Sequence, residues 1–348
     1  MTDKINSYAK EVAEYLKERK LILSAEKSTV TLFTPDTKEF NIHPQVSINN
    51  TIVPLERNPK LLGVVFDTMH TFTPHVNNTI NKAKSRINLM KTVAGNNWGQ
   101  NKEMLTITYK ALARSTLEYA IPVWSPIIPS TSWAKLQIVQ NQALRVITGC
   151  LQMTPIVHLH RETKILPLKE HGEMLTKQFL LNCHFPGHPS NKLLDRPAPE
   201  RPSRKPTILR LKQTIEHLLP VPDKPSLKQS IKRVNAETVQ STISQYENNK
   251  VLNDVPPEIS SEEANLTRKE RCLLSQLRSG YCSLLYSYKH RIDTTDTIQD
   301  LCPICGTSPH DTPHLFNCGQ NPTNLTPISL WTTPHQAANF LKLDEGIT

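Results

Sequence analysis

The helical part of this chain opens with Val76-Asn-Asn-Thr-Ile-Asn-Lys-Ala-Lys-Ser-Arg-Ile-Asn-Leu-Met-Lys-Thr-Val93. This stretch predicts an amphipathic helix, because its apolar residues recur at helical spacing. Its charged side chains are all basic: Lys82, Lys84, Arg86 and Lys91. Further helices are expected at 102–119 and 133–147, the second stopped by Gly149, and one or two more within 157–185. Together these segments predict a helical bundle.

A small α+β unit is expected before the bundle. Residues 3–22 predict a helix, and 29–33 predict a strand. A hairpin is expected around Asn49-Asn50, whose residue types tolerate tight turns. Residues 60–66 then predict a buried strand that closes the unit. The expected fold class is therefore α+β, with a small sheet followed by a mainly helical region.

Prolines interrupt the chain after the bundle. They crowd residues 186–226, which predicts an extended linker with one helix at 207–219. A weaker helical stretch is expected at 226–250. A well-formed helical segment follows at 261–288, carrying Arg268, Lys269, Arg271 and Arg278.

Charge and composition limit the classes of partner. The 348 residues include 41 Lys and Arg against 31 Asp and Glu, a formal net charge of +10. Such a balance favours polyanions, through phosphate neutralisation and counterion release, although anionic membrane surfaces would fit it equally well. No apolar run approaches the roughly 20 residues that span a bilayer, and no signal-peptide core is present. An intracellular protein that does not enter a membrane is expected, in the nucleus or the cytoplasm.

The seven cysteines divide into two groups. Four are scattered, and each is expected to be a small buried apolar residue: Cys150, Cys183, Cys272 and Cys282. The other three lie close together in Cys302-Pro-Ile-Cys305 and His314-Leu-Phe-Asn-Cys318.

The clustered cysteines and His314 have the spacing C-x2-C-x8-H-x3-C. Four sulfur and nitrogen ligands with no open position indicate a structural zinc site. His310 is a rival to His314, because it gives C-x2-C-x4-H, but the matching last cysteine would then fall at Leu315. So short a module would depend on the metal for most of its stability.

No catalytic motif is legible in the chain. The phosphate-loop, dinucleotide, metalloprotease and nucleophile-elbow patterns are absent. His158 and His160 are two residues apart and do not share a helix face, so structural or surface roles are expected. No adjacent aspartate pair lies on an apolar hairpin, as two-metal nucleotidyl transfer would require.

The order of several segments resembles a known family. These are Leu23-Ser-Ala-Glu-Lys27, Pro59-Lys-Leu-Leu-Gly63-Val-Val-Phe-Asp67, Ala94-Gly-Asn-Asn-Trp98-Gly99, Leu117-Glu-Tyr-Ala-Ile-Pro-Val-Trp124-Ser-Pro126 and Gln140-Asn-Gln-Ala-Leu-Arg145-Val-Ile-Thr-Gly149. The order is similar to the C-terminal part of reverse transcriptases (RNA-directed DNA polymerases) from jockey-like non-LTR retrotransposons. A Cys-Cys-His-Cys knuckle near the C-terminus fits the same pattern.

The resemblance implies a division of the chain. Residues 1–70 would be a palm remnant with a primer-grip-like hairpin, 71–185 a thumb-like helical domain, and 186–255 a proline-rich linker with weak helices. Residues 256–300 would be a basic helical segment, and 301–348 the zinc knuckle and tail.

The resemblance also implies site residues. Lys27 would be a candidate proton donor to the leaving group, and an exposed strand-end lysine is the alternative. Nucleic-acid contacts would come from Leu62, Gly63, Lys82, Lys84, Arg86, Lys91 and Arg145.

This sequence differs from the family's pattern in one respect that bears on activity. The family's catalytic Ala-Asp-Asp hairpin lies directly before the segment that begins here. Template–primer binding without polymerisation by this chain alone is therefore expected, with zinc as a structural cofactor and magnesium required only if the missing palm is present. RNA and DNA, the element's own RNA and its target DNA, are the expected partners. The alternatives are a shortened record of an active polymerase polyprotein, and a domesticated zinc-containing interaction protein.

Overall fold

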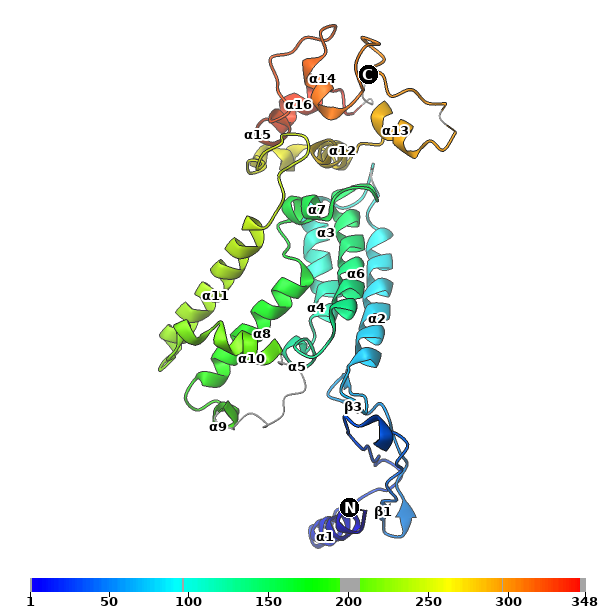
Figure 1. Ribbon diagram of the computed structural model, residues 1–348, viewed down its shortest axis with the longest axis vertical. Coiled ribbons are helices and arrows are strands. Elements are labelled where there is room, and N and C mark those ends of the chain that lie inside the picture. The colour runs from blue at the N-terminus through cyan, green and yellow to red at the C-terminus, as the bar shows by residue number, and fades with distance from the viewer. Residues whose placement is uncertain (1, 96, 195–206, 296, 345–348) are drawn as a thin grey trace.

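The chain forms an elongated molecule with three parts along its length. A computed structural model describes residues 2–95, 97–194, 207–295 and 297–344. The N-terminal part lies at one end, a bundle of helices fills the middle, and the C-terminal part lies at the other end (Figure 1). The described residues are mostly helical, with two small two-stranded sheets.

The N-terminal part is built from α1 (Thr2–Glu18), the short helix η1 (Thr37–Glu39) and two hairpins. Strands β1 (Ser47–Ile48) and β2 (Thr51–Ile52) pair antiparallel around the Asn49-Asn50 turn, as expected. Both asparagines are left-handed, with φ of 49° and 62°, which suits a two-residue hairpin turn. Asn6 ties α1 to this hairpin, because its side chain accepts from the Ser47 amide at 3.0 Å.

Two strand predictions in this part were wrong. Residues 29–33 form no strand, and only Val30 makes an isolated bridge, to Leu55. Residues 60–66 form a hairpin of β3 (Lys60–Leu61) and β4 (Val64–Val65) instead of one strand. Gly63 allows this turn, because its φ of 87° is readily adopted only without a Cβ.

The N-terminal part has a small core, and we expect it to exchange its amide hydrogens fastest among the three parts. Its own core consists of the buried Val46, Ile48 and Val53, and its strands are two residues long. Few buried contacts and short sheet edges give low local opening energies. Hydrogen-exchange mass spectrometry should show rapid exchange across 29–66 and slow exchange within the bundle helices. Slow exchange throughout 29–66 would contradict the prediction.

The middle part is a helical bundle around one large apolar core. It begins with α2 (Thr73–Lys91), followed by a long helix of three segments, α3 (Lys102–Thr108), the π-helical η2 (Tyr109–Arg114) and α4 (Ser115–Leu117). Next come α5 (Ile121–Trp124), α6 (Ser130–Thr148), α7 (Ile156–Thr163) and α8 (Leu168–His184). The fully buried Tyr109 and Trp124 belong to this core. The helices expected at 76–93, 102–119 and 133–147 are all present.

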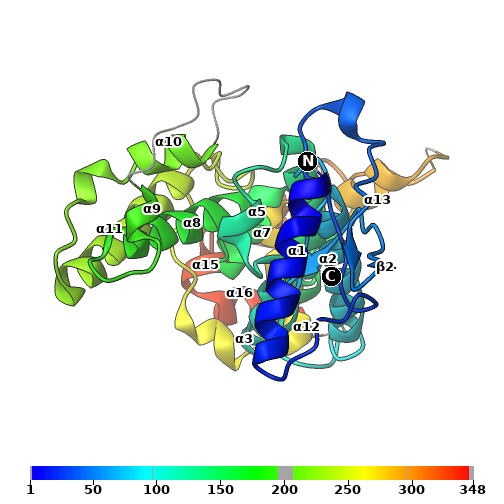
Figure 2. The same ribbon diagram turned by 90° about the horizontal axis from the view of Figure 1, so that it is seen from below.

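A second layer of helices packs on α8. It contains α9 (Asn191–Leu194), α10 (Thr207–Gln213), η3 (Glu216–Leu218) and α11 (Lys224–Ser244). Seen from below, these helices lie to one side of α2 and α3 (Figure 2). The 21-residue α11 lies where a weaker helical stretch was expected, and the Asp223 side chain caps its start. Part of the predicted proline-rich linker, 195–206, lies outside the described residues.

The C-terminal part is made of short helices around a third core. They are η4 (Ser261–Asn265), α12 (Arg268–Ser279), α13 (Tyr286–Ile292), α14 (Thr312–Asn317), α15 (Ser329–Thr332) and α16 (Pro334–Phe340). The helical segment expected at 261–288 is present but divided among η4, α12 and the start of α13. A capping box of Thr267 and Glu270 starts α12, and the left-handed Gly280 ends it. Within the described ranges, no helix is both long and apolar enough to cross a membrane.

Candidate metal centre and nucleic-acid interface

Four side chains in the C-terminal part converge on one point. The ligand atoms of Cys302, Cys305, His314 and Cys318 all lie within 4.8 Å of one another. Cys305 Sγ is 3.3 Å from His314 Nε2. These are the four residues that the sequence spacing selected, and the cluster can hold a metal ion.

Local backbone structure explains the convergence. A bridge between Leu301 and Pro309 closes a tight loop that carries both Cys302 and Cys305. Within it the left-handed Gly306 donates to the Cys302 carbonyl at 2.8 Å. Asp311 caps α14 by accepting from the His314 amide at 2.9 Å. His314 and Cys318 are thus placed one helical turn apart.

The donor set fits a zinc ion. In a tetrahedral site with Zn–S bonds of about 2.3 Å, ligand atoms lie roughly 3.8 Å apart, and four ligand atoms within 4.8 Å of one another fit such a site. Hydrogen bonds from the Thr307 hydroxyl and amide lower the pKa of Cys305 to about 6, which favours the thiolate that binds metals. Three sulfurs and one nitrogen leave no position for substrate, so the site suits a structural role.

His310 is not part of the cluster. It is buried, and its Nδ1 accepts from the Tyr286 amide at 3.2 Å while its ring lies against the Tyr286 ring. Its Nε2 has no hydrogen-bond partner among the described residues. The geometry therefore favours His314 over His310 as the histidine ligand.

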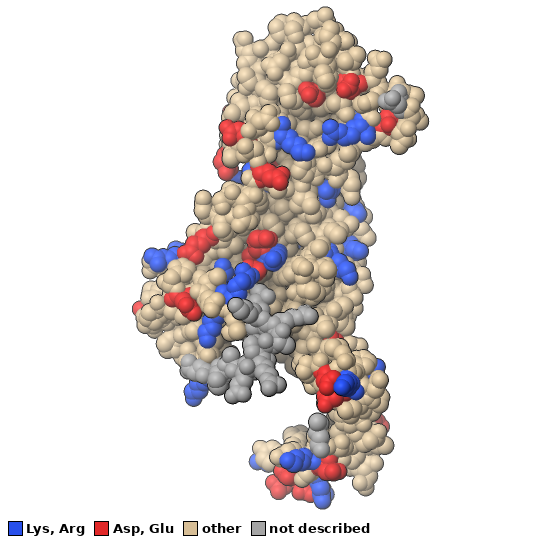
Figure 3. Space-filling model, in the orientation of Figure 1, with Lys and Arg blue, Asp and Glu red and all other residues tan. Residues whose placement is uncertain are grey.

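The basic residues predicted on α2 lie on its solvent side. Lys82, Lys84, Arg86 and Lys91 are exposed, and none of them forms an ion pair with a described carboxylate. Basic side chains follow the edge of the bundle where α2 lies (Figure 3). Arg86 also reaches across the bundle and donates to the Leu112 carbonyl at 2.7 Å. The opposite side of α2 is buried in the core.

The other residues that were predicted to have a functional role differ in how exposed they are and in what they contact. Leu62 is 85% exposed at the tip of the β3–β4 hairpin, and its carbonyl accepts from Tyr119 Oη at 2.7 Å. Gly63 lies beside the same ring, since a Cβ there would be 3.1 Å from Tyr119. Arg145 is half-buried and donates to the Leu151 and Gln152 carbonyls, which gives it a structural partner. Lys27 is exposed in the N-terminal part, and the structure adds no partner for it among the described residues.

The arginines of the expected basic segment point inward, which sequence reasoning missed. Arg268, Arg271 and Arg278 of α12 are all buried. Arg268 donates to the Val146 carbonyl at the end of α6 at 2.8 Å, and Arg271 pairs with Glu103 of α3. This helix therefore attaches the C-terminal part to the bundle instead of presenting a charged face to solvent.

Arg278 is the centre of a buried ionic network. It pairs with Glu162 of α7 at 3.3 Å and with Glu263 of η4, while Lys102 pairs with the same two carboxylates. Burial acts to raise the pKa of the Glu162 carboxyl, but Lys102 and Arg278 outweigh it and hold that pKa below its usual range. No local sequence pattern indicates this network, because its members lie far apart in the chain.

His158 and His160 are structural, as expected. Both are buried, and each binds a backbone carbonyl: His158 that of Ser275 at 2.9 Å, and His160 that of Ile165 at 2.7 Å. Burial lowers the pKa of His158 to about 4, so this side chain is neutral at physiological pH. The four scattered cysteines are also buried and unpaired, as expected.

Comparison with known proteins shows the class of enzyme that the chain resembles: the RNA-directed DNA polymerases of transposons. It is 28% identical over 170 residues to the probable RNA-directed DNA polymerase from transposon X-element of Drosophila melanogaster, which covers 47% of this chain and 18% of that protein. It is 23% identical over 175 residues, half of this chain and 19% of the relative, to the probable enzyme from transposon BS of the same species. It is 28% identical over 154 residues to the enzyme from mobile element jockey of Drosophila funebris, 42% of this chain and 16% of the relative.

These relatives confirm the resemblance predicted from the segment order. The matched part of the chain corresponds to less than a fifth of each relative's length. No family model and no solved structure matches the chain.

Proposed function

We propose that this chain is the template–primer-binding and zinc-bearing region of a retrotransposon reverse transcriptase. The exposed basic side of α2, which has no carboxylate partners among the described residues, carries the proposal. Its lysines are free to neutralise phosphates. The likeness to RNA-directed DNA polymerases supports RNA and DNA as the polyanions.

In this proposal the three parts have separate tasks. The β3–β4 hairpin, with Leu62 and Gly63 at its tip, contacts the primer end, and the bundle contacts the template–primer backbone through α2. Zinc in the Cys/His cluster stabilises the C-terminal part. We propose that this chain alone binds template–primer without polymerising, because the features that support a function are surfaces that can bind nucleic acid.

The salt dependence of binding tests the role of α2. The triple variant Lys82→Gln, Lys84→Gln and Lys91→Gln should bind a template–primer duplex more weakly. The slope of log K against log salt should fall by roughly 2 to 3, because each phosphate contact contributes about 0.9. Fluorescence anisotropy across a salt series measures this slope, and primer extension on the same duplex checks for synthesis.

A matched control separates a specific surface from general positive charge. Lys224, Lys228 and Lys232 are exposed lysines on α11, and their triple glutamine variant removes the same charge. This control should keep a slope close to that of the unmodified chain. Equal loss in both triple variants would reject α2 as the contact surface, and no binding at low salt would reject the proposed function.

A further inference from the structure

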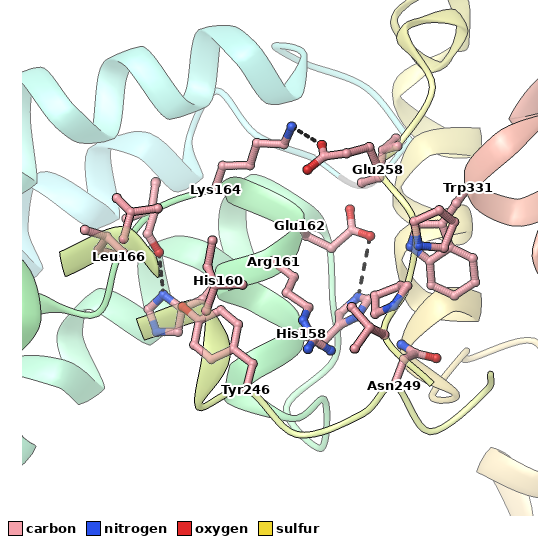
Figure 4. Close-up of a pocket in the computed structure, with 17 residues that line it drawn as sticks. His158, His160, Arg161, Glu162, Lys164, Leu166, Tyr246, Asn249, Glu258 and Trp331 are labelled. Atoms are coloured by element: carbon pink, nitrogen blue, oxygen red, sulfur yellow. Dashed lines mark hydrogen bonds and ion pairs between the residues drawn. The ribbon is translucent and has the colours of Figure 1, made fainter. Parts of the chain in front are cut away.

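A cavity of about 360 Å³ lies between the bundle, α11 and the C-terminal part. Residues of α7 form one wall, the end of α11 forms another, and the 255–259 segment and Trp331 of α15 close it (Figure 4). Much of the lining is apolar, including Leu166, Val239, Ile243 and Pro257. The volume falls within the range of about 300–1,000 Å³ that is typical of small-ligand sites.

Two aromatic side chains and Arg161 give the cavity its character. The other charged groups in its lining are paired: Lys164 with Glu258, and Glu162 with Lys102 and Arg278. Tyr246 and Trp331 lie on opposite sides of the cavity, with Arg161 between them (Figure 4). The Arg161 guanidinium lies 5.5 Å from the centre of the Tyr246 ring. Arg161 is half-buried, burial lowers its pKa, and it forms no ion pair with a described carboxylate. A half-buried cation of this kind is well placed to bind an anion.

Polar groups in the walls are already engaged, which limits the ligand. The His160 ring contacts the Ile165 carbonyl at 2.7 Å and the Gln137 amide at 3.2 Å. The Asn249 amide donates to the Arg278 carbonyl at 2.9 Å. The interior therefore suits a flat, largely apolar group, and the anionic part of the ligand is left to Arg161 at the side.

More cations without carboxylate partners continue from the cavity. Arg161 and Asn249 also line a smaller hollow that contains Lys250 and the exposed Glu247. Lys250 Nζ is 3.1 Å from Tyr281 Oη, and both Lys250 and Arg291 lie over the Tyr281 ring, 5.4 and 5.2 Å from its centre. Two like charges held together on one tyrosine, with no described carboxylate paired to either, form a site for an anion such as a phosphate.

We propose that this cavity binds one unpaired base of a single-stranded nucleic acid, with the adjoining phosphates on Arg161, Lys250 and Arg291. A base is flat and largely apolar on its faces, and it stacks on aromatic side chains without regard to sequence. A nucleic-acid strand also supplies several phosphates in succession, which suits three cations in and beside the two hollows. The proposal rests on the proposed function and adds to it a site for single strands, separate from α2.

The test uses the full chain and a short single-stranded oligonucleotide that contains 2-aminopurine, a fluorescent base. Tyr246→Leu removes the stacking ring, Arg161→Gln removes the cation, and Val239→Phe fills the cavity. Each variant should weaken binding by about tenfold, in line with the loss of one stacked base, and should reduce the change in 2-aminopurine fluorescence. Circular dichroism and thermal melting identify any variant that fails to fold. Two further variants then take its place. Tyr246→Phe keeps the ring and should retain binding, and Ile243→Phe fills the cavity and should weaken it.

Arg19→Gln is the matched control for Arg161→Gln. Arg19 also lies over a tyrosine ring, that of Tyr15 on α1, at the other end of the molecule. Its loss removes the same charge and should leave single-strand affinity within about twofold of the unmodified chain.

Three outcomes would overturn the proposal. The first is that all cavity variants bind the single-stranded oligonucleotide with the same affinity as the Arg19→Gln control. The second is binding of the uncharged apolar dye N-phenyl-1-naphthylamine that Val239→Phe abolishes but a saturating oligonucleotide does not displace, since the cavity would then take an apolar partner. The third is duplex binding through α2 with no single-strand binding. Absence of both kinds of binding would instead reject the proposed function itself.

Discussion

Replacing Cys305 with serine is expected to abolish zinc binding and to unfold the loop and helix of residues 301–318. One of four ligands is lost, and the apparent free energy of zinc binding to comparable small modules is about 10–16 kcal/mol. The apolar contacts of so short a segment cannot replace that contribution. Helices within 76–180 should stay folded, because they have a separate core. Zinc content by mass spectrometry, with hydrogen exchange of both regions, measures the result.

Two variants serve as controls for Cys305→Ser. Cys282→Ser removes another thiol from the C-terminal part but lies outside the Cys/His cluster, so it should keep one equivalent of zinc. His310→Gln should also keep the metal, because the side chain of His310 lies outside the ligand group. Stoichiometric zinc in Cys305→Ser, or its loss in His310→Gln, would contradict the ligand set.

Replacing Arg278 with methionine should lower the free energy of unfolding by about 3–5 kcal/mol, because two buried carboxylates, Glu162 and Glu263, are then left to share Lys102 as their near cation. The side chain of Arg278 is fully buried, and its Nε also donates to the Leu330 carbonyl at 2.9 Å. Methionine fills a similar volume, so the expected loss is mainly electrostatic. Urea unfolding followed by circular dichroism measures the change.

The exposed pair of Arg210 and Glu173 provides the control for Arg278→Met. Arg210→Met breaks an ion pair whose side chains are 56% and 21% exposed, and it should cost no more than about 1 kcal/mol. Adding Glu263→Gln to Arg278→Met should recover part of the stability, because Lys102 then balances the one carboxylate that remains beside it, Glu162. Equal effects of the two single arginine variants would show that the network contributes no more than a surface pair.

The sequence predicted features that depend on neighbouring residues. The ligand spacing of Cys302 to Cys318 identified the four converging side chains, because a short loop and one helical turn decide their placement. Apolar periodicity gave the long helices of the bundle, and Asn49-Asn50 gave the hairpin turn. The residue pattern alone did not show the turn at Leu62-Gly63, because the apolar run around it resembles one buried strand, whereas the family resemblance implied a hairpin there.

Features that depend on distant partners could not be predicted in the same way. Arg271 and Arg278 have the pattern of a solvated helix face, and only the folded structure shows that they are buried and paired with Glu103 of α3 and Glu162 of α7. The cavity at Tyr246 and Trp331 likewise needs three segments that are far apart in the chain. Spacing along the chain carries no signal for either arrangement.

The ionic network around α12 has a consequence for how the molecule meets its partners from a distance. Three cations, Lys102, Arg271 and Arg278, are matched there by three carboxylates, Glu103, Glu162 and Glu263. The network has no net charge, so the protein's net charge of +10 comes from residues outside it. That net charge acts on approaching polyanions and raises their rate of encounter. Its reach is about 8 Å at physiological ionic strength, so the association rate constant should rise steeply as salt is diluted.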